Sequence, residues 1–477
     1  MYAASMVNNL TGYFYWLIIS SIAGPEIVGI VSAIAGLSIL LTGILSFGVN
    51  IGVQRYLGKA LGMGDENKLR TYFWSSFILI FLVFATTSIL LLIMGLHGYS
   101  IINLSPFMLI FSAILTLTYT NLIPLSLIRS LLRTELIFAM SLIGGILKIG
   151  TGLTLVFMGW GWVGATIGYL CPSLVNLVVG MLFSLKNVSL RPVVSLSAIN
   201  DVLKAGIVTW LPTTITLIGY QLGVLMVFAY TSATETGLYY IASAIAGAIT
   251  MVSMSTISLL LPFLSSLQNG RKRACFRVLK LCLTLVLPPS VFALIYPQFV
   301  LSLLGSEYTV ASPILSTLLL TVVPNTIVGA VGNLVYAYGH YSLVLMIGLA
   351  ANIPRVVLYY PLVLKAGGLG TAISSTIGSF VGMCAALLVA RRVNFRIEWS
   401  VVGKILGLPI AIGLVSWLFR LQWWMGLISL SLTYLLYLKL GILTRHEIVE
   451  IANVLKMESL LRKIYNRYGG IVEKLIG

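Results

Sequence analysis

Runs of about twenty apolar residues, repeated along almost the whole chain, constrain this sequence more than any other feature. A helix that crosses the hydrocarbon core of a membrane needs about 20 mostly apolar residues. About fourteen such runs lie within the 477 residues, the second of them near 27–53. Hydrophobic residues make up 59% of the chain and charged residues 9%, whereas a soluble protein has about 25% charged residues. The sequence therefore predicts an all-α polytopic membrane protein of about 14 transmembrane helices and excludes a water-soluble enzyme.

The basic residues predict how the chain is oriented. Lysine and arginine outnumber aspartate and glutamate by 29 to 12, which gives a net charge of +17. Of the 29 basic residues, 25 fall in one set of alternate loops and the C-terminal tail, and only Lys365 and Arg420 fall in the opposite set. Cytoplasmic loops carry such an excess, so we expect a multi-pass plasma membrane protein with both termini in the cytoplasm. No nucleic acid partner is expected, because the basic residues are dispersed among apolar runs.

Short motifs recur at an offset of about 207 residues, which indicates an internal duplication; chance matching of apolar segments is the alternative. The matches are Gly12-Tyr13 with Gly219-Tyr220, Gly29 with Gly237, and the small-residue pair Gly164 and Gly168 with Gly378 and Gly382. Because each copy holds an even number of spans, the two lobes are expected to be related by a pseudo-two-fold axis along the membrane normal.

The predicted parts of the chain are four. They are an N-terminal six-helix lobe at 1–188, a C-terminal six-helix lobe at 200–391, an additional helix pair at 392–441 and a cytoplasmic amphipathic tail at 442–477. The tail has the apolar and basic pattern of a helix that lies on the inner leaflet. Docking of the tail to a partner is the alternative.

Two basic residues lie inside predicted spans. Lys148 lies near the middle of the span 136–158, and Arg355 is at a similar depth in the span 342–364. They are 207 residues apart, so we expect them at equivalent positions, facing each other across a central cavity. Each charge costs about 2.5–3.5 kcal/mol to insert, and no Asp or Glu lies inside a predicted span. Charges in the membrane usually mark a transport pathway, so both are expected to bind an anionic headgroup. Capping by backbone carbonyls or hydroxyl groups is the alternative.

Five further residues are secondary candidates for the wall of the cavity. They are Arg55, Asn8, Tyr13, Tyr220 and Gln221. Aromatic and amide side chains in a wet cavity suit the binding of sugar rings, whereas tyrosine near a helix end also anchors proteins at the membrane interface. For Arg55, at the inner end of a span, an arginine that reaches the lipid headgroups is the favoured interpretation.

Motifs of known catalytic sites are absent from the sequence. It has no GxxxxGK[ST] phosphate loop and no HExxH zinc motif. Its four cysteines are scattered, without the spacing of a metal site. We therefore expect no catalytic residue, no metal and no cofactor. A coupling ion, Na⁺ or H⁺, is left open, with Glu26 and Glu235 near helix ends as carboxylates that could hold it.

Several motifs together resemble a known family. They are Gly24-Pro25-Glu26, the run from Gly48 to Tyr56, Glu235-Thr236-Gly237-Leu238-Tyr239, Leu304-Gly305-Ser306-Glu307-Tyr308, Ala337-Tyr338-Gly339-His340 and Gly367-Gly368-Leu369-Gly370-Thr371-Ala372. In order and spacing the sequence is similar to the polysaccharide-biosynthesis flippases of the multidrug/oligosaccharidyl-lipid/polysaccharide exporter superfamily.

The resemblance implies a transporter with two six-helix lobes, alternating access and an appended helix pair. Its implied cargo is an oligosaccharide on a polyprenyl phosphate or pyrophosphate, moved from the cytoplasmic to the outer leaflet. Implied partners are this lipid-linked oligosaccharide, membrane lipids, and glycosyltransferase/polymerase or oligosaccharyltransferase machinery, with the protein itself a monomer. Three alternatives stay open, namely a multidrug or metabolite exporter, a lipid II flippase and a scaffold that transports nothing.

Overall fold

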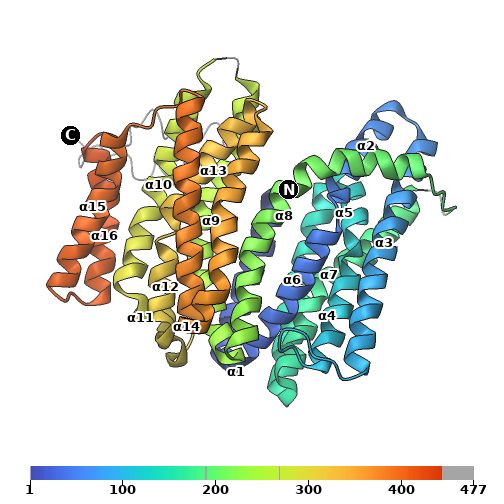
Figure 1. Ribbon diagram of the computed structural model, residues 1–477, viewed down its shortest axis with the longest axis horizontal. Coiled ribbons are helices and arrows are strands. Elements are labelled where there is room, and N and C mark those ends of the chain that lie inside the picture. Colours follow the sequence, from blue (N-terminus) through green and yellow to red (C-terminus); the bar gives the residue numbers. More distant parts are fainter. Residues whose placement is uncertain (1, 189–190, 268, 443–477) are drawn as a thin grey trace. The chain divides into compact units, whose positions relative to one another are not determined.

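The computed structural model describes residues 2–188, 191–267 and 269–442, and over these ranges the chain is helical with no β-strand. Figure 1 shows the helices, which in chain order are α1 (Tyr2–Leu45), α2 (Val49–Met63), α3 (Glu66–Leu96), α4 (Pro106–Thr118), η1 (Tyr119–Asn121), α5 (Leu122–Ser130), α6 (Thr134–Leu155), η2 (Val156–Trp160), α7 (Gly161–Asn187), α8 (Leu196–Tyr230), α9 (Ala233–Ser266), α10 (Arg271–Ile295), α11 (Pro297–Ser302), η3 (Ser306–Ala311), α12 (Ser312–Leu319), α13 (Val322–Ala337), α14 (Tyr341–Arg392), α15 (Trp399–Leu418) and α16 (Trp423–Lys439). The all-α fold class is confirmed. The predicted tail lies outside the described residues beyond Ile442.

The chain forms two compact units. Unit 1 comprises the residues up to Ile241 together with Leu304–Tyr308 and Val356–Thr371, and unit 2 comprises Ala242–Leu303, Thr309–Arg355 and the chain from Ala372 onward. Both α9 and α14 therefore contribute residues to each unit. The lobe boundaries expected from the sequence stay a prediction.

Ten segments of the described chain are long and apolar enough to cross a membrane, which agrees with a multi-pass membrane protein. Three of them, Val7–Leu45, Thr134–Asn187 and Tyr341–Arg392, have 39, 54 and 52 residues. At 1.5 Å per residue each is much longer than a bilayer core of about 30 Å. The number of fourteen crossings, like the two-fold relation of the lobes, stays a prediction.

Glycines with positive φ bend these three long segments. Gly24 has φ 74°, Gly161 has φ 51° and ψ −131°, and Gly367 has φ 52° and ψ −130°. Glycine adopts such angles without the steric cost that a Cβ would bring. Where the sequence predicts a loop between two spans, these segments therefore have a bend inside a continuous helical segment. Glu26, which was expected in such a loop, follows the bend in α1.

Helices α6 and α7 pack against each other in antiparallel directions through glycine. A Cβ at Gly164 would lie 2.7 Å from the Leu155 Cβ, and one at Gly168 would lie 2.6 Å from the Gly152 Cα. In unit 2, Cβ atoms at Gly378 and Gly382 would lie 2.4 Å and 2.6 Å from atoms of Ala351. The prediction that these four glycines form faces for close helix packing is confirmed.

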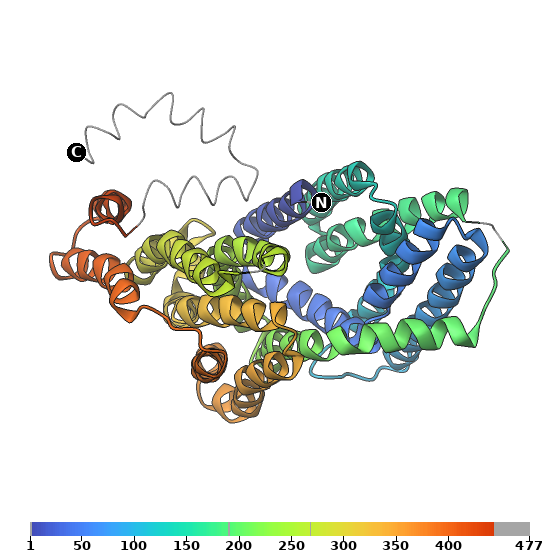
Figure 2. The same cartoon turned by 90° about the horizontal axis from the view of Figure 1, so that it is seen from above.

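A reciprocal glycine contact fixes α8 to α2 within unit 1, where α8 also packs on α3 (Figure 2). A Cβ on Gly48 or on Gly206 would lie 2.4 Å from the carbonyl oxygen of the other residue. The predicted second span, 27–53, ends earlier than expected, at Leu45, and α2 is a separate helix. The reason is left-handed backbone at Phe47 (φ 47°) and Gly48 (φ 70°), which a continuous α-helix cannot contain.

Substitution of Gly206 by alanine tests the close approach of α2 and α8. Overpacking costs about 1–3 kcal/mol, so Gly206→Ala should lower the thermal unfolding midpoint of the purified protein in detergent. Gly58→Ala is the matched control, because Gly58 is also helical and no atom lies within 4 Å of its Cβ position. The control should be neutral or stabilising by up to about 1 kcal/mol. Equal midpoints for the two variants would contradict the contact.

Candidate functional site: a buried lysine between aromatic rings

Lys148 lies in α6 at the crossing with α7, inside unit 1. Only 8% of the residue is exposed, and a Cβ at Gly168 would lie 2.8 Å from the Lys148 carbonyl oxygen. The absence of a side chain at Gly168 therefore brings the backbone of α7 onto the turn of α6 that carries the lysine. The next residue of α7, Tyr169, consequently stands beside the lysine side chain.

Two tyrosine rings hold the ammonium group of Lys148. Its Nζ lies 4.5 Å from the centroid of Tyr15, on α1, and 4.5 Å from the centroid of Tyr169, on α7. In the part of the chain that the structure describes, Nζ forms no ion pair and no hydrogen bond. A cation over an aromatic face gains about 0.5–2 kcal/mol, so two such contacts offset most of the insertion cost of about 2.5–3.5 kcal/mol. The rings lower the cost of burying the charge without neutralising it.

Tyr15 is itself fixed in place. The residue is fully buried, and its hydroxyl donates a hydrogen bond to the backbone carbonyl of Ala165 on α7. A Cβ at Gly152 would lie 2.8 Å from the Tyr15 ring, so the ring fills the space that glycine leaves on α6. The first of the two rings is thus held by α6 and α7 before any ligand arrives.

The aromatic cluster extends beyond these two rings. Trp16 lies 5.8 Å from Tyr169 and 4.8 Å from Tyr240 on α9, measured between ring centroids. Tyr169 and Tyr240 are half-buried. Sequence reasoning did not select Tyr15, Trp16, Tyr169 or Tyr240. A tyrosine in the middle of a span, away from the interface where tyrosine is common, is the signal that would have identified Tyr169.

Arg355 lies in α14 within unit 2, and its surroundings differ from those of Lys148. The residue is 3% exposed. Its guanidinium donates hydrogen bonds to Asn352 Oδ1 at 3.1 Å and to Ser379 Oγ at 3.0 Å. Gly378 permits this approach, because a Cβ there would lie 2.7 Å from the Arg355 Cβ. Arg355 is thus contacted by neutral oxygen atoms, whereas Lys148 is contacted by aromatic rings. The two cations belong to different units, and that they face each other stays a prediction.

The structure does not connect the secondary candidates with Lys148. Asn8 and Arg55 are exposed, Tyr13 is 41% exposed and Tyr220 is 54% exposed. Gln221 is half-buried and lies against α1, where a Cβ at Gly36 would be 3.6 Å from its Oε1. Among the described residues, no hydrogen bond, ion pair or cation–π contact links these side chains to Lys148. Their role in a cavity wall stays a prediction.

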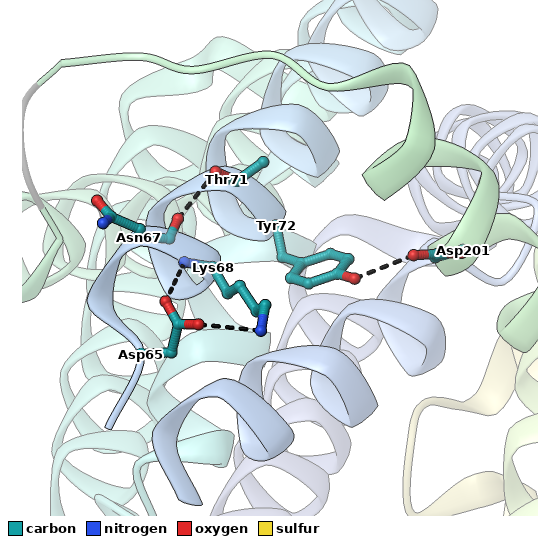
Figure 3. Close-up of polar contacts among 6 residues, drawn as sticks. All are labelled: Asp65, Asn67, Lys68, Thr71, Tyr72 and Asp201. Carbon is teal, nitrogen blue, oxygen red and sulfur yellow. Dashed lines mark hydrogen bonds and ion pairs between the residues drawn. The ribbon is translucent and has the colours of Figure 1, made fainter. Parts of the chain in front are cut away.

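The region of unit 1 that follows Arg55 contains a polar link between α3 and α8. Figure 3 shows the Tyr72 hydroxyl donating to a carboxylate oxygen of Asp201, at 3.0 Å. Tyr56 stacks on Tyr72 with 4.8 Å between ring centroids. Asp65 caps α3 by accepting from the Lys68 backbone N–H at 2.9 Å, and this hydrogen bond lowers the pKa of the Asp65 carboxyl below its usual value. The Asp65 contact stabilises the start of α3, and the Tyr72 contact joins α3 to α8.

Glu235 serves as a backbone cap at the bend in α14. Its carboxylate accepts a hydrogen bond of 2.8 Å from the Gly368 N–H, within unit 1. A Cβ at Gly367 would lie 2.0 Å from Glu235 Oε1, so glycine is needed there for space as well as for its φ. Over the described residues, no group of three or more His, Cys, Asp or Glu side chains is arranged to hold a metal ion.

Comparison with known proteins places the fold. A sequence profile described as "Polysaccharide biosynthesis protein" matches residues 25–313. No curated protein matches the chain. Among solved structures, the chain is similar to the lipid II flippase MurJ in an inward closed conformation, with 16% identity and a TM-score of 0.76 over 92% of this chain and 97% of that chain.

Two other similar structures are transporters of the MOP superfamily. One is an inward-facing multidrug resistance transporter of the MATE family, with 16% identity and a TM-score of 0.61 over 82% of this chain and 93% of that chain. The other, from Pyrococcus furiosus, is described as having a binding pocket of reversed polarity; it has 16% identity and a TM-score of 0.54 over 82% of this chain and 94% of that chain. At this identity the likeness shows a shared fold.

A double-mutant cycle tests the contact between Lys148 and Tyr169. Tyr169→Leu should destabilise the protein more with Lys148 present than in a Lys148→Met background, giving a coupling energy of about 0.5–2 kcal/mol in unfolding free energy. Tyr169→Phe is the control, because phenylalanine keeps a ring face for the ammonium group. A coupling energy near zero for Tyr169→Leu, or the same value for Tyr169→Phe, would contradict the cation–π contact.

Proposed function

The chain belongs to the polysaccharide biosynthesis protein family, as its motifs predicted, and from this premise we propose that it is a flippase for lipid-linked oligosaccharide. The cargo is an oligosaccharide on a polyprenyl phosphate or pyrophosphate, carried from the cytoplasmic to the outer leaflet of the plasma membrane by alternating access. The work of such a protein is binding and conformational change, without a catalytic residue.

The observation that carries the proposal is the charge of Lys148, buried and held by neutral rings. A buried cation without a neighbouring carboxylate favours an anionic ligand, because bringing the two charges together compensates both. Phosphate and pyrophosphate are the anions that this cargo provides. Half-buried Tyr169 and Tyr240 supply aromatic faces beside the lysine, on which the apolar face of a sugar ring can pack.

Arg355 is proposed as the second cation of the site. Its hydrogen bonds to Asn352 and Ser379 hold the guanidinium in one orientation, and a planar guanidinium matches a phosphate group in geometry. Comparison of the transport rates of the single and double variants decides whether Arg355 and Lys148 act on one phosphate or on two.

The membrane potential can drive such a transporter. With the inside negative, outward movement of one net negative charge gains about 2.3 kcal/mol per 100 mV. A pyrophosphate cargo therefore does not require a carboxylate-bound ion, provided that the protein's own charges carry no compensating current. Glu235, the coupling carboxylate that the sequence left open, is used here to cap a helix.

A lipid II flippase is the second candidate, favoured by the similarity to MurJ over 92% of this chain. Lipid II also presents a pyrophosphate, so the cation argument does not separate the two cargoes. A multidrug exporter for cationic drugs is less favoured, because a buried lysine repels a cationic substrate. Glycosyltransferase/polymerase or oligosaccharyltransferase machinery is a proposed partner, and a monomer is the proposed state.

Transport in vesicles that contain only this protein tests the function. Fluorescent polyprenyl-pyrophosphate oligosaccharide is placed in the inner leaflet, and its arrival in the outer leaflet is followed by quenching. Lys148→Met should lower the initial rate about tenfold or more, because a hydrogen bond between charged groups contributes about 1.5–3 kcal/mol. Arg355→Gln and the double variant are measured beside it. Lys59→Gln, which removes one exposed positive charge from α2, is the control and should keep the wild-type rate.

Three results would contradict the proposal. A wild-type rate for the Lys148→Met and Arg355→Gln double variant, at equal protein incorporation, would remove the anion site. Absence of transport by the wild-type protein, with both lipid-linked oligosaccharide and lipid II supplied, would favour a scaffold. Transport of lipid II alone would favour the second candidate.

A further inference from the structure

A cavity of about 470 Å³ lies at the turn that joins α15 to α16, inside unit 2. Tyr296, which directly follows α10, contributes to its wall, and the end of α15 and the following turn contribute Ser416, Trp417 and Arg420. Sites for small ligands commonly have volumes of about 300–1,000 Å³. The volume lies within this range, and the wall combines apolar, aromatic and cationic side chains.

The walls of this cavity are held by contacts that do not involve a ligand. The Tyr296 hydroxyl donates a hydrogen bond of 3.0 Å to the Leu421 carbonyl oxygen. A Cβ at Gly426 would lie 2.2 Å from the Tyr296 ring, so α16 approaches the ring closely. Phe299 stacks on Trp423 with 4.1 Å between centroids and 9° between planes. The hairpin tip is thus attached both to Tyr296 and to α11.

Arg420 is the cation of this cavity and lies just past the C-terminal end of α15, where the Leu421 N–H donates a hydrogen bond back to the Ser416 carbonyl oxygen. Its backbone is left-handed, with φ 48°, a conformation that glycine adopts more easily. The side chain is exposed and forms no ion pair within the described chain. The predicted loops form two alternate sets, and Arg420 and Lys365 are the only basic residues in the set that lacks the basic excess. On that side of the membrane the distribution of charge disfavours arginine.

The aromatic side chains around Arg420 indicate that it lies at the level of lipid headgroups. Large aromatic side chains are exposed on both sides of the turn, at Trp417, Phe419, Trp423 and Trp424. Tryptophan is enriched where a membrane protein passes the interface. An arginine among these residues is therefore close to phosphate groups, which a guanidinium binds by two parallel hydrogen bonds.

We propose that the tip of the α15–α16 hairpin binds the phosphate group of a membrane lipid, with Arg420 contacting the phosphate and the walls of the cavity contacting the adjoining part of the lipid. Ile295 and Leu418 line the cavity and would remain against water if free phosphate were the ligand, which favours a lipid. Phospholipid and polyprenyl phosphate both present this phosphate group. The site does not depend on the proposed transport function.

Native mass spectrometry of the full chain, released from detergent micelles with added lipid, tests the site. Phosphatidylglycerol, a polyprenyl phosphate and inorganic phosphate are supplied in separate arms. The wild-type protein should retain one or both lipids, and Arg420→Gln should retain about tenfold less of the same lipid, because a charge-assisted hydrogen-bond pair is lost. The lipid that is retained identifies the source of the phosphate.

Control variants separate this site from general electrostatic attraction. Lys365→Gln removes the other basic residue of the same set of loops and should leave lipid retention unchanged. Arg420→Lys keeps the charge and should recover part of the retention, and Trp417→Ala should weaken lipid retention by removing part of the wall. Equal retention by Arg420→Gln and the wild type would overturn the proposal. So would inorganic phosphate that occupies the site as well as either lipid does.

Discussion

The contact between one ammonium group and two tyrosine rings determines what the centre of unit 1 can do. The free-energy cost of a lysine charge in the middle of an apolar helix must be offset by other contacts. A carboxylate would offset it by cancelling the charge. The rings of Tyr15 and Tyr169 offset it while the charge remains. A buried charge that is stabilised without being neutralised remains able to bind an anion, which is what transport of a phosphate-linked cargo requires.

Glycine contacts make this arrangement possible and recur along the chain. Gly168 brings α7 onto the turn that carries Lys148, and Gly152 leaves space for the Tyr15 ring. Elsewhere in unit 1 another tyrosine packs against a glycine, because a Cβ placed on Gly223 of α8 would lie 3.0 Å from the hydroxyl oxygen of Tyr359 on α14. Tyr359 is 207 residues after Gly152, and Gly223 is 208 after Tyr15. A tyrosine–glycine contact thus recurs at nearly the offset of the sequence motifs, with the tyrosine and the glycine on exchanged positions, and the internal duplication stays a prediction.

The sequence predicted the helical membrane class, the family and the position of Lys148, because a charge within an apolar run is recognisable without knowledge of its neighbours. It did not predict the rings around Lys148, since Tyr169 reaches the lysine only through the register of α6 on α7. Tyr13 was selected and Tyr15 was not; two residues along a helix rotate by about 200°, so the two tyrosines point to opposite sides. The end of the second span was misplaced because the left-handed backbone at Phe47 is not encoded in hydrophobicity.

The proposal that Lys148 binds the phosphate of a lipid-linked cargo is tested most directly by comparing two ligands on two proteins. Polyprenyl-pyrophosphate oligosaccharide and the same oligosaccharide on a neutral polyprenol are titrated onto the wild-type protein and onto Lys148→Met in nanodiscs. We expect the wild type to bind the pyrophosphate ligand about tenfold or more tightly than the neutral one, and Lys148→Met to lose this preference, because a charge-assisted contact is removed. An unchanged preference in Lys148→Met would contradict the assignment of Lys148 as the anion ligand.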